Sequence, residues 1–253
     1  MSGHSKWSSI KHAKAITDNR RGKQFTKLAK EIIVVARQGG GDPDTNFKLR
    51  MAIQRGKDVN MPADTITRAI KKGTGESTDG AQMAEVLYEG YGPGGTAILL
   101  EALTDNRNRT ASDVRSTFTK AGGNLAEVGA VAWQFAQRGV LVAETDAENA
   151  EELAMVAIDA GADDFETDDA TLLVYSSVES LETIRRTMAE HDAVIRSSEL
   201  SMMPTNTVQL NAKAAKQTLR LLDKLEDLDD VQRVYSNGDF PDDVLEEYGN
   251  EAG

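Results

Sequence analysis

The spacing of the apolar residues changes near residue 80, and this change constrains the fold more than any other feature of the sequence. Before it, apolar side chains recur three and four positions apart, as Phe25, Leu28, Ile32 and Val35 do. This is the period of an amphipathic helix. After it, short runs rich in apolar residues alternate with helical stretches. The chain is therefore predicted to begin as a small helical bundle and to continue as a mixed α/β protein.

The bundle is predicted to contain three helices, over residues 22–38, 43–58 and 62–73. A run of three glycines follows the first helix and ends it, because glycine tolerates the left-handed conformation of a helix C-terminus. Asp42 is the predicted N-cap of the second helix, and Pro43 is its predicted first residue.

Three strands and one helix are predicted in the next part of the chain. Residues 84–89 and 96–102 form two strands joined by the turn GYGPGG, and residues 131–135 form a third. Thr110 is the predicted start of the helix, with Asp113 three residues later as in a capping box.

Residues 136–203 follow the order strand, helix, strand, strand, helix, strand, which is that of a ferredoxin-like split βαβ unit. The predicted elements are 140–143, 148–160, 164–167, 172–176, 181–191 and 194–202. Three later elements are too few for an independent domain and are predicted to complete the sheet begun at residue 84. They are the strands 208–210 and 231–235 and the helix 214–225.

The predicted fold class is therefore α+β, with an N-terminal three-helix bundle followed by two α/β domains (ferredoxin-like split βαβ units), the second inserted in the first. The predicted division is a flexible basic arm (1–20), a helical bundle (21–73), a hinge (74–80), a middle α/β domain (81–135 plus 204–240), an inserted domain (136–203) and an acidic tail (241–253). The arm has few apolar residues and the tail is acidic, so both are expected to be poorly ordered.

Charge is distributed unevenly along the chain. Residues 1–72 carry 16 Lys or Arg and 6 Asp or Glu, a net charge of +10, whereas residues 73–253 carry 13 and 35, a net charge of −22. Basic side chains neutralise phosphates and release counterions, so the basic part is predicted to bind nucleic acid. The alternative is that the two oppositely charged parts attract each other, as in a protein-interaction module.

The candidate contacts to nucleic acid lie mainly in the basic arm and the first helix. They are Lys6, Trp7, Lys11, His12, Lys14, Arg20, Arg21, Lys23 and Lys27. An aromatic side chain in a basic segment can stack on an unpaired base, which is typical of RNA recognition. The alternative for Trp7 is that it packs on the first helix.

Arg107 and Arg109 are weaker candidates, in the segment TDNRNRT that precedes a predicted helix. Free backbone N–H groups at a helix N-terminus favour anions, so the two side chains could contribute to a phosphate site. The alternative is a solvated loop in which the arginines pair with nearby acids such as Asp105.

Several functional classes are not supported by the sequence. The chain has no Cys, and its three His have no ligand spacing, so no catalytic residue, metal ligand or cofactor is predicted. The acidic segment 162–169 lacks the pattern of an EF-hand, and a solvated loop is preferred to a metal site there. No apolar run is long enough to span a bilayer, so no membrane contact is predicted. The third alternative is an enzyme with an unrecognised carboxylate site, for which Asp163 or Asp168 is a candidate.

Six sequence segments resemble the YebC/PmpR family, and the resemblance covers nearly the whole chain. They are GHSKWSSIKHAK (3–14), RGKQFTKLAKEI (21–32), NMPADTITRAIKKGTG (60–75), YEGYGPGG (88–95), LTDNRNRTASDVR (103–115) and GGNLAEVGAVAWQF (122–135). The resemblance implies a helical bundle with two α/β domains, in a cytoplasmic, non-enzymatic regulator of gene expression. It also implies that the basic N-terminal motif contacts nucleic acid. We expect a monomer.

The resemblance leaves two kinds of nucleic acid open. Many members of the family are described as DNA-binding transcriptional regulators. Others, including the mitochondrial translational activator of cytochrome oxidase, resemble ribosome-associated factors that assist translation through proline-rich stretches. The expected partner is therefore duplex DNA, or ribosomal or transfer RNA on the ribosome. The acidic region 144–200 matches no quoted motif, and a contact with basic proteins is a hypothesis for it.

Overall fold

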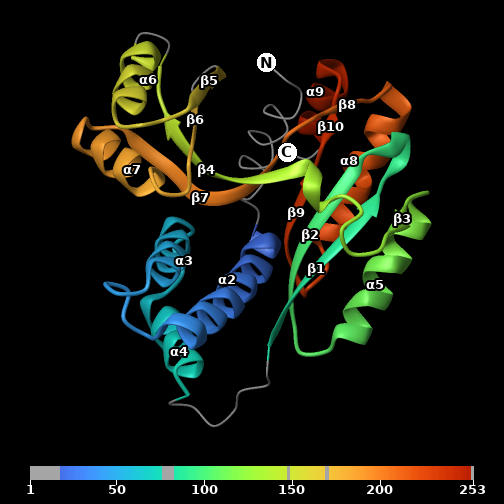
Figure 1. Cartoon of the computed structure of the whole chain (residues 1–253), viewed down its shortest axis with the longest axis horizontal. Helices are drawn as coiled ribbons and strands as arrows, with labels where there is room; N and C mark the ends of the chain where they lie inside the picture. The colour runs from blue at the N-terminus through green and yellow to red at the C-terminus, as the bar shows by residue number, and fades with distance from the viewer. Residues whose placement is uncertain (1–17, 76–82, 147–148, 169–170, 252–253) are drawn as a thin grey trace. The chain divides into compact units, whose positions relative to one another are not determined.

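The computed structural model describes residues 18–75, 83–146, 149–168 and 171–251 (Figure 1). Residues 1–17 of the predicted arm and 76–80 of the predicted hinge lie outside these ranges. The described residues form two compact units: one is Ala136–Met203, and the other combines residues up to Phe135 with residues from Pro204 onward. The α+β fold class predicted from the sequence is confirmed.

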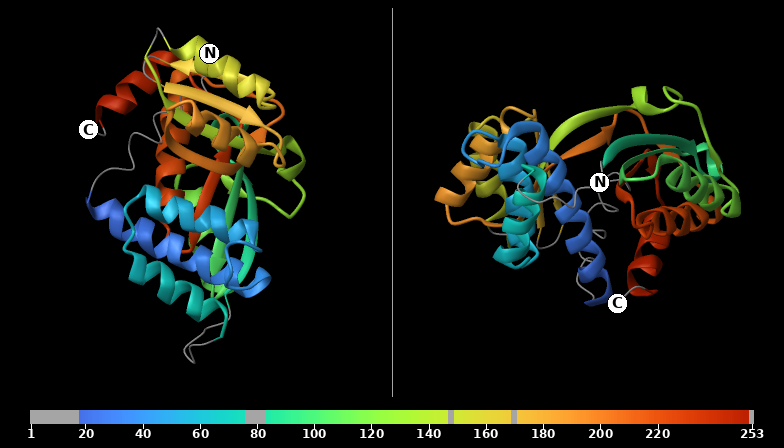
Figure 2. Two further views of the ribbon diagram at one scale, coloured as in Figure 1. Left: turned by 90° about the vertical axis from the view of Figure 1, so that its left-hand side faces the viewer. Right: turned by 90° about the horizontal axis from the view of Figure 1, so that it is seen from below.

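The larger unit begins with the three predicted helices, α2 (Asp18–Gly39), α3 (Phe47–Asp58) and α4 (Ala63–Gly73). They lie side by side in Figure 2, and their apolar faces form one core that includes Leu28, Ile32, Leu49 and Ile66. Gly73 is required for this packing, because a Cβ atom at this position would lie 2.5 Å from the carbonyl oxygen of Ile33.

Helix α3 begins at Phe47, so the predicted start at residues 42 and 43 is wrong. Asn46 is the N-cap, and its Oδ1 accepts a hydrogen bond of 3.1 Å from the Leu49 N–H. Its Nδ2 donates to the carbonyl oxygens of Val35 and Gly40, both at 2.9 Å. Asn46 therefore caps α3 and fixes the preceding turn against α2. Asp42 lies too far before the first turn of α3 to cap it.

A four-stranded sheet follows in the order β3-β1-β2-β9. Its long strands are antiparallel: β1 (Ala84–Tyr91), β2 (Ala97–Thr104) and β9 (Val231–Ser236). The short strand β3 (Asn124–Leu125) extends β1. The GYGPGG segment forms the predicted turn, with a 3-10 turn η1 at Pro93–Gly95 and positive φ angles at Gly94 and Gly95.

Helices α5 (Arg107–Lys120) and α8 (Ala212–Glu226) pack on this sheet and share its core with Ile98, Leu100 and Phe118. A third helix, α9 (Asp242–Glu251), replaces the poorly ordered tail expected at residues 241–253. Val244 and Leu245 are buried in the same core. The helix was not predicted because these are two adjacent apolar residues in an otherwise acidic segment. Residues 252–253 lie outside the described ranges.

Helix α5 begins at Arg107, so the predicted start at Thr110 is wrong. Asn106 is the N-cap, and its Oδ1 accepts a hydrogen bond of 3.1 Å from the Arg109 N–H. Thr110 lies in the first turn of the helix, and its side chain is buried against Thr104. Asn and Thr are both favourable N-cap residues. Because the side chain of Thr110 is buried against Thr104, Asn106 is the residue that caps the helix.

The strand predicted over residues 131–135 is also wrong. A 3-10 turn η2 occupies Ala132–Gln134, and the next strand begins only at Phe135. The segment is held by the buried side chain of Glu89, which accepts hydrogen bonds from the N–H groups of Gly129, Val131 and Ala132. These backbone donors are therefore unavailable to a strand partner.

The second unit contains β4 (Phe135–Glu144), α6 (Ala150–Asp159), β5 (Asp164–Asp168), β6 (Thr171–Ser176), α7 (Leu181–Glu190) and β7 (Val194–Pro204). Its strand order is β5-β6-β4-β7, and β6 is antiparallel to both β4 and β5. This is the predicted ferredoxin-like arrangement. Leu141, Leu172, Ile184 and Met188 are fully buried.

Two short strands, β8 (Val208–Gln209) and β10 (Gly238–Asp239), pair in parallel beside the first sheet. Among the described helices, none has the length and apolar character needed to cross a bilayer.

Candidate nucleic-acid interface

The first candidate contacts lie in the basic arm, and most of them fall where the structure gives no description. Lys6, Trp7, Lys11, His12 and Lys14 lie outside the described residues. Arg20 and Arg21 belong to the first turns of α2. Their position at the start of this helix carries the basic segment into the bundle.

Helix α2 has a polar face opposite its apolar one. Lys23, Lys27 and Lys30 recur four and three positions apart, so they share one side of the helix. We call these three residues the lysine stripe. Leu28 and Ile32, half a turn away, are buried against α3 and α4. The lysine stripe is therefore directed away from the core of the bundle.

The lysine stripe contacts an acidic turn (residues 226–230), which joins α8 to β9 in the same unit. Lys23 Nζ lies 3.4 Å from Asp227 Oδ1. Lys27 Nζ donates a hydrogen bond to the main-chain carbonyl oxygen of Glu226. Lys23 and Lys27, both predicted to contact nucleic acid, thus have partners within the molecule.

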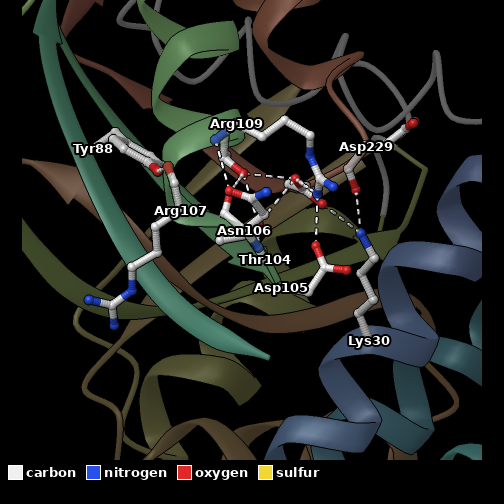
Figure 3. A network of polar contacts seen from close by, with 10 residues as sticks. Lys30, Tyr88, Thr104, Asp105, Asn106, Arg107, Arg109 and Asp229 are labelled. Atoms are coloured by element: carbon white, nitrogen blue, oxygen red, sulfur yellow. Dashed lines mark hydrogen bonds and ion pairs between the residues drawn. The ribbon is translucent and has the colours of Figure 1, made fainter. Parts of the chain in front are cut away.

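Lys30 makes the most buried contacts of the stripe (Figure 3). Its Nζ donates to the carbonyl oxygen of Asp229 at 2.9 Å and forms an ion pair of 3.0 Å with Asp230 Oδ1. The side chain of Lys30 is 20% exposed and that of Asp230 is 11% exposed. An ion pair so little exposed is screened by solvent much less than one at the surface.

Asp230 is the centre of a network from four segments of the chain. Its Oδ2 lies 2.7 Å from Arg109 Nη2, 2.8 Å from Thr110 Oγ1 and 3.2 Å from Thr104 Oγ1. Burial alone would raise the pKa of Asp230, but hydrogen bonds from Arg109, Thr110 and Lys30 lower the pKa to about 2. The carboxylate is therefore ionised at neutral pH and fully supplied with donors.

This network bears on the predicted phosphate site of Arg107 and Arg109 in the TDNRNRT segment. Arg109 pairs with both Asp230 and Asp105, so its guanidinium is directed to carboxylates of the same molecule. Arg107 is exposed, and Figure 3 shows its side chain pointing away from the network. The structure does not bring the two arginines together into one anion site.

A second set of cations, which sequence reasoning did not single out, has no carboxylate partner among the described residues. We call this set the outer cations: Arg37, Lys48, Lys57, Arg68, Lys71 and Lys72. Arg68, Lys71 and Lys72 recur three and four positions apart on α4, opposite the buried Ile66 and Ala69. They therefore form a basic face on the exposed side of this helix.

Some of these cations also suit their helix. Arg37, Lys71 and Lys72 lie in the last turns of α2 and α4, where a positive charge interacts favourably with the helix dipole. That interaction is worth at most about 1 kcal/mol at an exposed site, and it leaves the charge accessible to an anion.

The sequence contained a signal for both groups. The four- and three-residue spacing of the lysine stripe places it on one side of α2, and the run EDLDD at 226–230 is its acidic complement. No local pattern shows that two segments about 200 positions apart meet. The spacing of Arg68, Lys71 and Lys72 within a predicted helix was sufficient to indicate a basic face.

The acidic segment 162–169 offers no comparable site. Asp163 pairs with Arg138 at 2.9 Å. In the described parts of the chain, no group of three or more His, Asp or Glu side chains is arranged to hold a metal ion.

Comparison with protein families gives matches over most of the chain. The family described as TACO1/YebC protein N-terminal domain matches residues 5–76. The family described as TACO1/YebC second and third domain matches residues 83–238.

Individual relatives match over the full length. A probable transcriptional regulatory protein of Dehalococcoides mccartyi strain CBDB1 is 52% identical over 252 residues, which are 100% of each chain. One of Natranaerobius thermophilus is 50% identical, over 97% of this chain and 99% of its own. Among solved structures, a conserved hypothetical protein of Aquifex aeolicus is 42% identical with a TM-score of 0.82, over 89% of this chain and 93% of its own.

Proposed function

Since this chain belongs to the TACO1/YebC family, we propose that it is a non-enzymatic regulator of gene expression that binds nucleic acid through its helical bundle and basic N-terminal segment. Relatives named as probable transcriptional regulatory proteins support the regulatory role. The observation that carries the proposal is the set of outer cations without carboxylate partners among the described residues, on an otherwise acidic molecule.

The outer cations supply the kind of contact that nucleic-acid backbones require. Exposed Lys and Arg side chains neutralise phosphates and release condensed counterions, which needs no base-specific geometry. The rest of the molecule, with its excess of acids, is repelled by the same backbone. The bundle is therefore the part of the molecule that faces the nucleic acid.

Salt dependence of binding tests the proposal. If the basic segment and bundle together neutralise about six phosphates, log K falls with log salt at a slope of about −4 to −5. The measurement is a titration of the full chain with a random-sequence duplex of about two helical turns, repeated over a range of salt concentrations. An affinity that does not depend on salt would contradict the proposal.

A charge reversal on α4 tests the outer cations themselves. Lys71→Glu with Lys72→Glu is expected to weaken binding at least tenfold and to reduce the salt slope by about 2, because each phosphate contact contributes about 1. The matched control is Lys213→Glu with Lys224→Glu, on exposed positions of α8. Equal losses in both variants would mean that only the net charge matters, and the proposed interface would be wrong.

Duplex DNA is the first target to test, because the relatives are named transcriptional regulators. The alternative is a ribosome-associated translation factor without DNA binding, which the aromatic Trp7 within the basic arm favours. Crosslinking in cells, followed by sequencing of the bound nucleic acid, separates the two. Enrichment of promoter DNA supports transcriptional regulation, and enrichment of ribosomal RNA supports the alternative. We expect a cytoplasmic monomer without a cofactor in either case.

A further inference from the structure

The lysine stripe and the acidic turn form a contact that the proposed function does not explain. We propose that the lysine stripe is a second phosphate-binding surface, which the acidic turn covers until nucleic acid displaces it. The inference rests on the proposed function, because it assigns a regulated part of the same interface. It concerns Lys23, Lys27 and Lys30, and not the outer cations.

The dimensions of the stripe suit a nucleic-acid backbone. Lys23 and Lys30 are seven positions apart, which corresponds to about 10 Å along a helix. One strand of B-DNA places a phosphate about every 3.4 Å along its axis, so the length of the stripe corresponds to about three such steps. The lysine stripe also continues the basic segment that ends with Arg20 and Arg21 in the same helix.

The acidic turn presents to the lysines the kind of oxygen atoms that phosphates present. Lys27 and Lys30 donate to the main-chain carbonyl oxygens of Glu226 and Asp229. Lys23 and Lys30 pair with carboxylates of the same turn. Phosphate oxygens can replace these acceptors one for one. The ammonium group of Lys is a compact charge with three rotatable N–H donors, so it can donate to acceptors in many directions.

The ion pairs across the contact can separate without leaving a buried charge unpaired. When Lys30 leaves, Asp230 retains Arg109, Thr104 and Thr110 within its own part of the molecule. The neighbouring pair between Glu31 on α2 and Arg233 on β9 behaves in the same way.

In that neighbouring pair, Glu31 retains Arg55 within the bundle, and Arg233 retains Glu101 on β2. The usual penalty for breaking a buried ion pair comes from the uncompensated charge that remains, and here each charge keeps a partner.

The pair at the end of the stripe is the weakest. The side chains of Lys23 and Asp227 are 48% and 64% exposed. Such pairs contribute little and are screened by salt. Displacement is therefore expected to begin at Lys23, next to the basic N-terminal segment, and to proceed toward Lys30.

The test is to remove charge from the acidic turn while keeping its shape. Asp227→Asn with Asp229→Asn, in the full chain, is expected to bind the random-sequence duplex about fivefold tighter. The salt slope should become steeper by about 1 to 2, because one or two further phosphates are neutralised. The control is Glu151→Gln with Glu152→Gln, exposed acids of α6 that give the same change in net charge.

A second pair of variants identifies the residues that gain the contact. Lys23→Gln with Lys27→Gln is expected to weaken binding more in the neutralised-turn variant than in the original chain, since there the Asp227 carboxylate no longer competes with phosphate for Lys23. Additive effects would overturn the inference.

An affinity and slope equal to those of the Glu151/Glu152 control would also overturn it. In either case the Lys71 and Lys72 result would stand by itself, so failure of this inference is distinguishable from failure of the proposed function. A larger gain with single-stranded RNA of equal length than with duplex would retain the inference and assign the stripe to RNA.

Discussion

Glu89 and Asp230 are both buried carboxylates of the larger unit, and they are stabilised in different ways. Glu89 is 2% exposed and accepts three backbone N–H groups, from Gly129, Val131 and Ala132, at 2.6 to 2.8 Å. Asp230, taken as a whole residue, is 9% exposed, and its carboxylate contacts cationic side chains and threonine hydroxyl groups. One carboxylate is held by backbone dipoles, and the other by opposite charge.

The difference separates a local role from a long-range one. Within the described chain no cation pairs with Glu89, whose donors all come from one loop, so its function is to shape that loop. The loop presents Val128 and Trp133, which are 89% and 71% exposed, on a fixed backbone. Asp230 instead joins β2 and α5 to α2, which lies far from both of them in the sequence.

The largest effect is expected for Glu89→Ala. It removes three charge-assisted hydrogen bonds and leaves buried N–H groups without acceptors, so we expect a loss of about 3 kcal/mol in the free energy of unfolding. The loop should also become mobile, which fluorescence anisotropy of Trp133 detects in a Trp7→Phe background. Glu127→Ala, an exposed position of the same loop, is the control. Equal stability of the two variants would contradict the role given to Glu89.

A smaller effect is expected for Asp230→Asn. The amide keeps one acceptor, but it removes the charge that faces Arg109 and Lys30, and we expect a loss of about 2 kcal/mol measured by urea unfolding. Asp229→Asn is a close control, because Asp229 contacts Lys30 through its main-chain carbonyl oxygen. If the two variants lose the same stability, the Asp230 side chain is not the centre of the network.

Acid should remove the contribution of Asp230 in a defined interval. Its pKa is lowered from 3.8 to about 2 in the folded protein, so the stabilisation is complete above the unfolded value and is lost as the pH falls from about 4 to about 2. Up to about 2 kcal/mol is expected to be lost in this way. Urea unfolding of the original chain and of Asp230→Asn should therefore give converging stabilities at a pH between these two values. A constant difference would disprove the assignment.

Glu89 titrates in the same direction for another reason. Burial raises its pKa, and the hydrogen bonds from Gly129, Val131 and Ala132 outweigh burial and lower the pKa. Its contribution is thus also lost as the pH falls through the lowered pKa.

The smallest effect is expected for Lys30→Met. Asp230 keeps its other donors, so the free energy of unfolding should change by less than about 1 kcal/mol. The change should depend little on salt, because the pair is little exposed. Thermal unfolding at low and high salt measures it. A loss greater than that of Asp230→Asn would show that Lys30, and not Arg109, is the main partner of the carboxylate.

Local patterns predicted most of the elements of the fold. The three- and four-residue periodicity of the apolar residues located α2 and α4, because each of these helices buries one face. The alternation of elements over 136–203 identified the ferredoxin-like unit. Element boundaries failed where two capping residues competed, as Asn106 and Thr110 did, because a tertiary contact made the choice.

The candidate site was less predictable than the fold. Composition indicated a basic surface, and the excess of Lys and Arg before residue 73 is real. Composition does not show which cations meet carboxylates elsewhere in the chain. Lys27 and Arg109 were predicted to contact nucleic acid, and both have partners in the structure that lie more than 100 positions away. Such pairings depend on the tertiary fold, which no local window contains.

The chain leaves for the ferredoxin-like unit after Gln134 and returns at Thr205, and these two residues are hydrogen-bonded to each other. The N–H and the hydroxyl of Thr205 lie 2.8 and 3.0 Å from the carbonyl oxygen of Gln134. Asn237 fixes the side chain of Gln134 from the neighbouring strand end. Hydrogen bonds thus hold together the two points at which the chain leaves and re-enters the larger unit. An excision of residues 136–203 would need only a short splice to reconnect the remaining protein, as for a module gained by insertion into a surface loop.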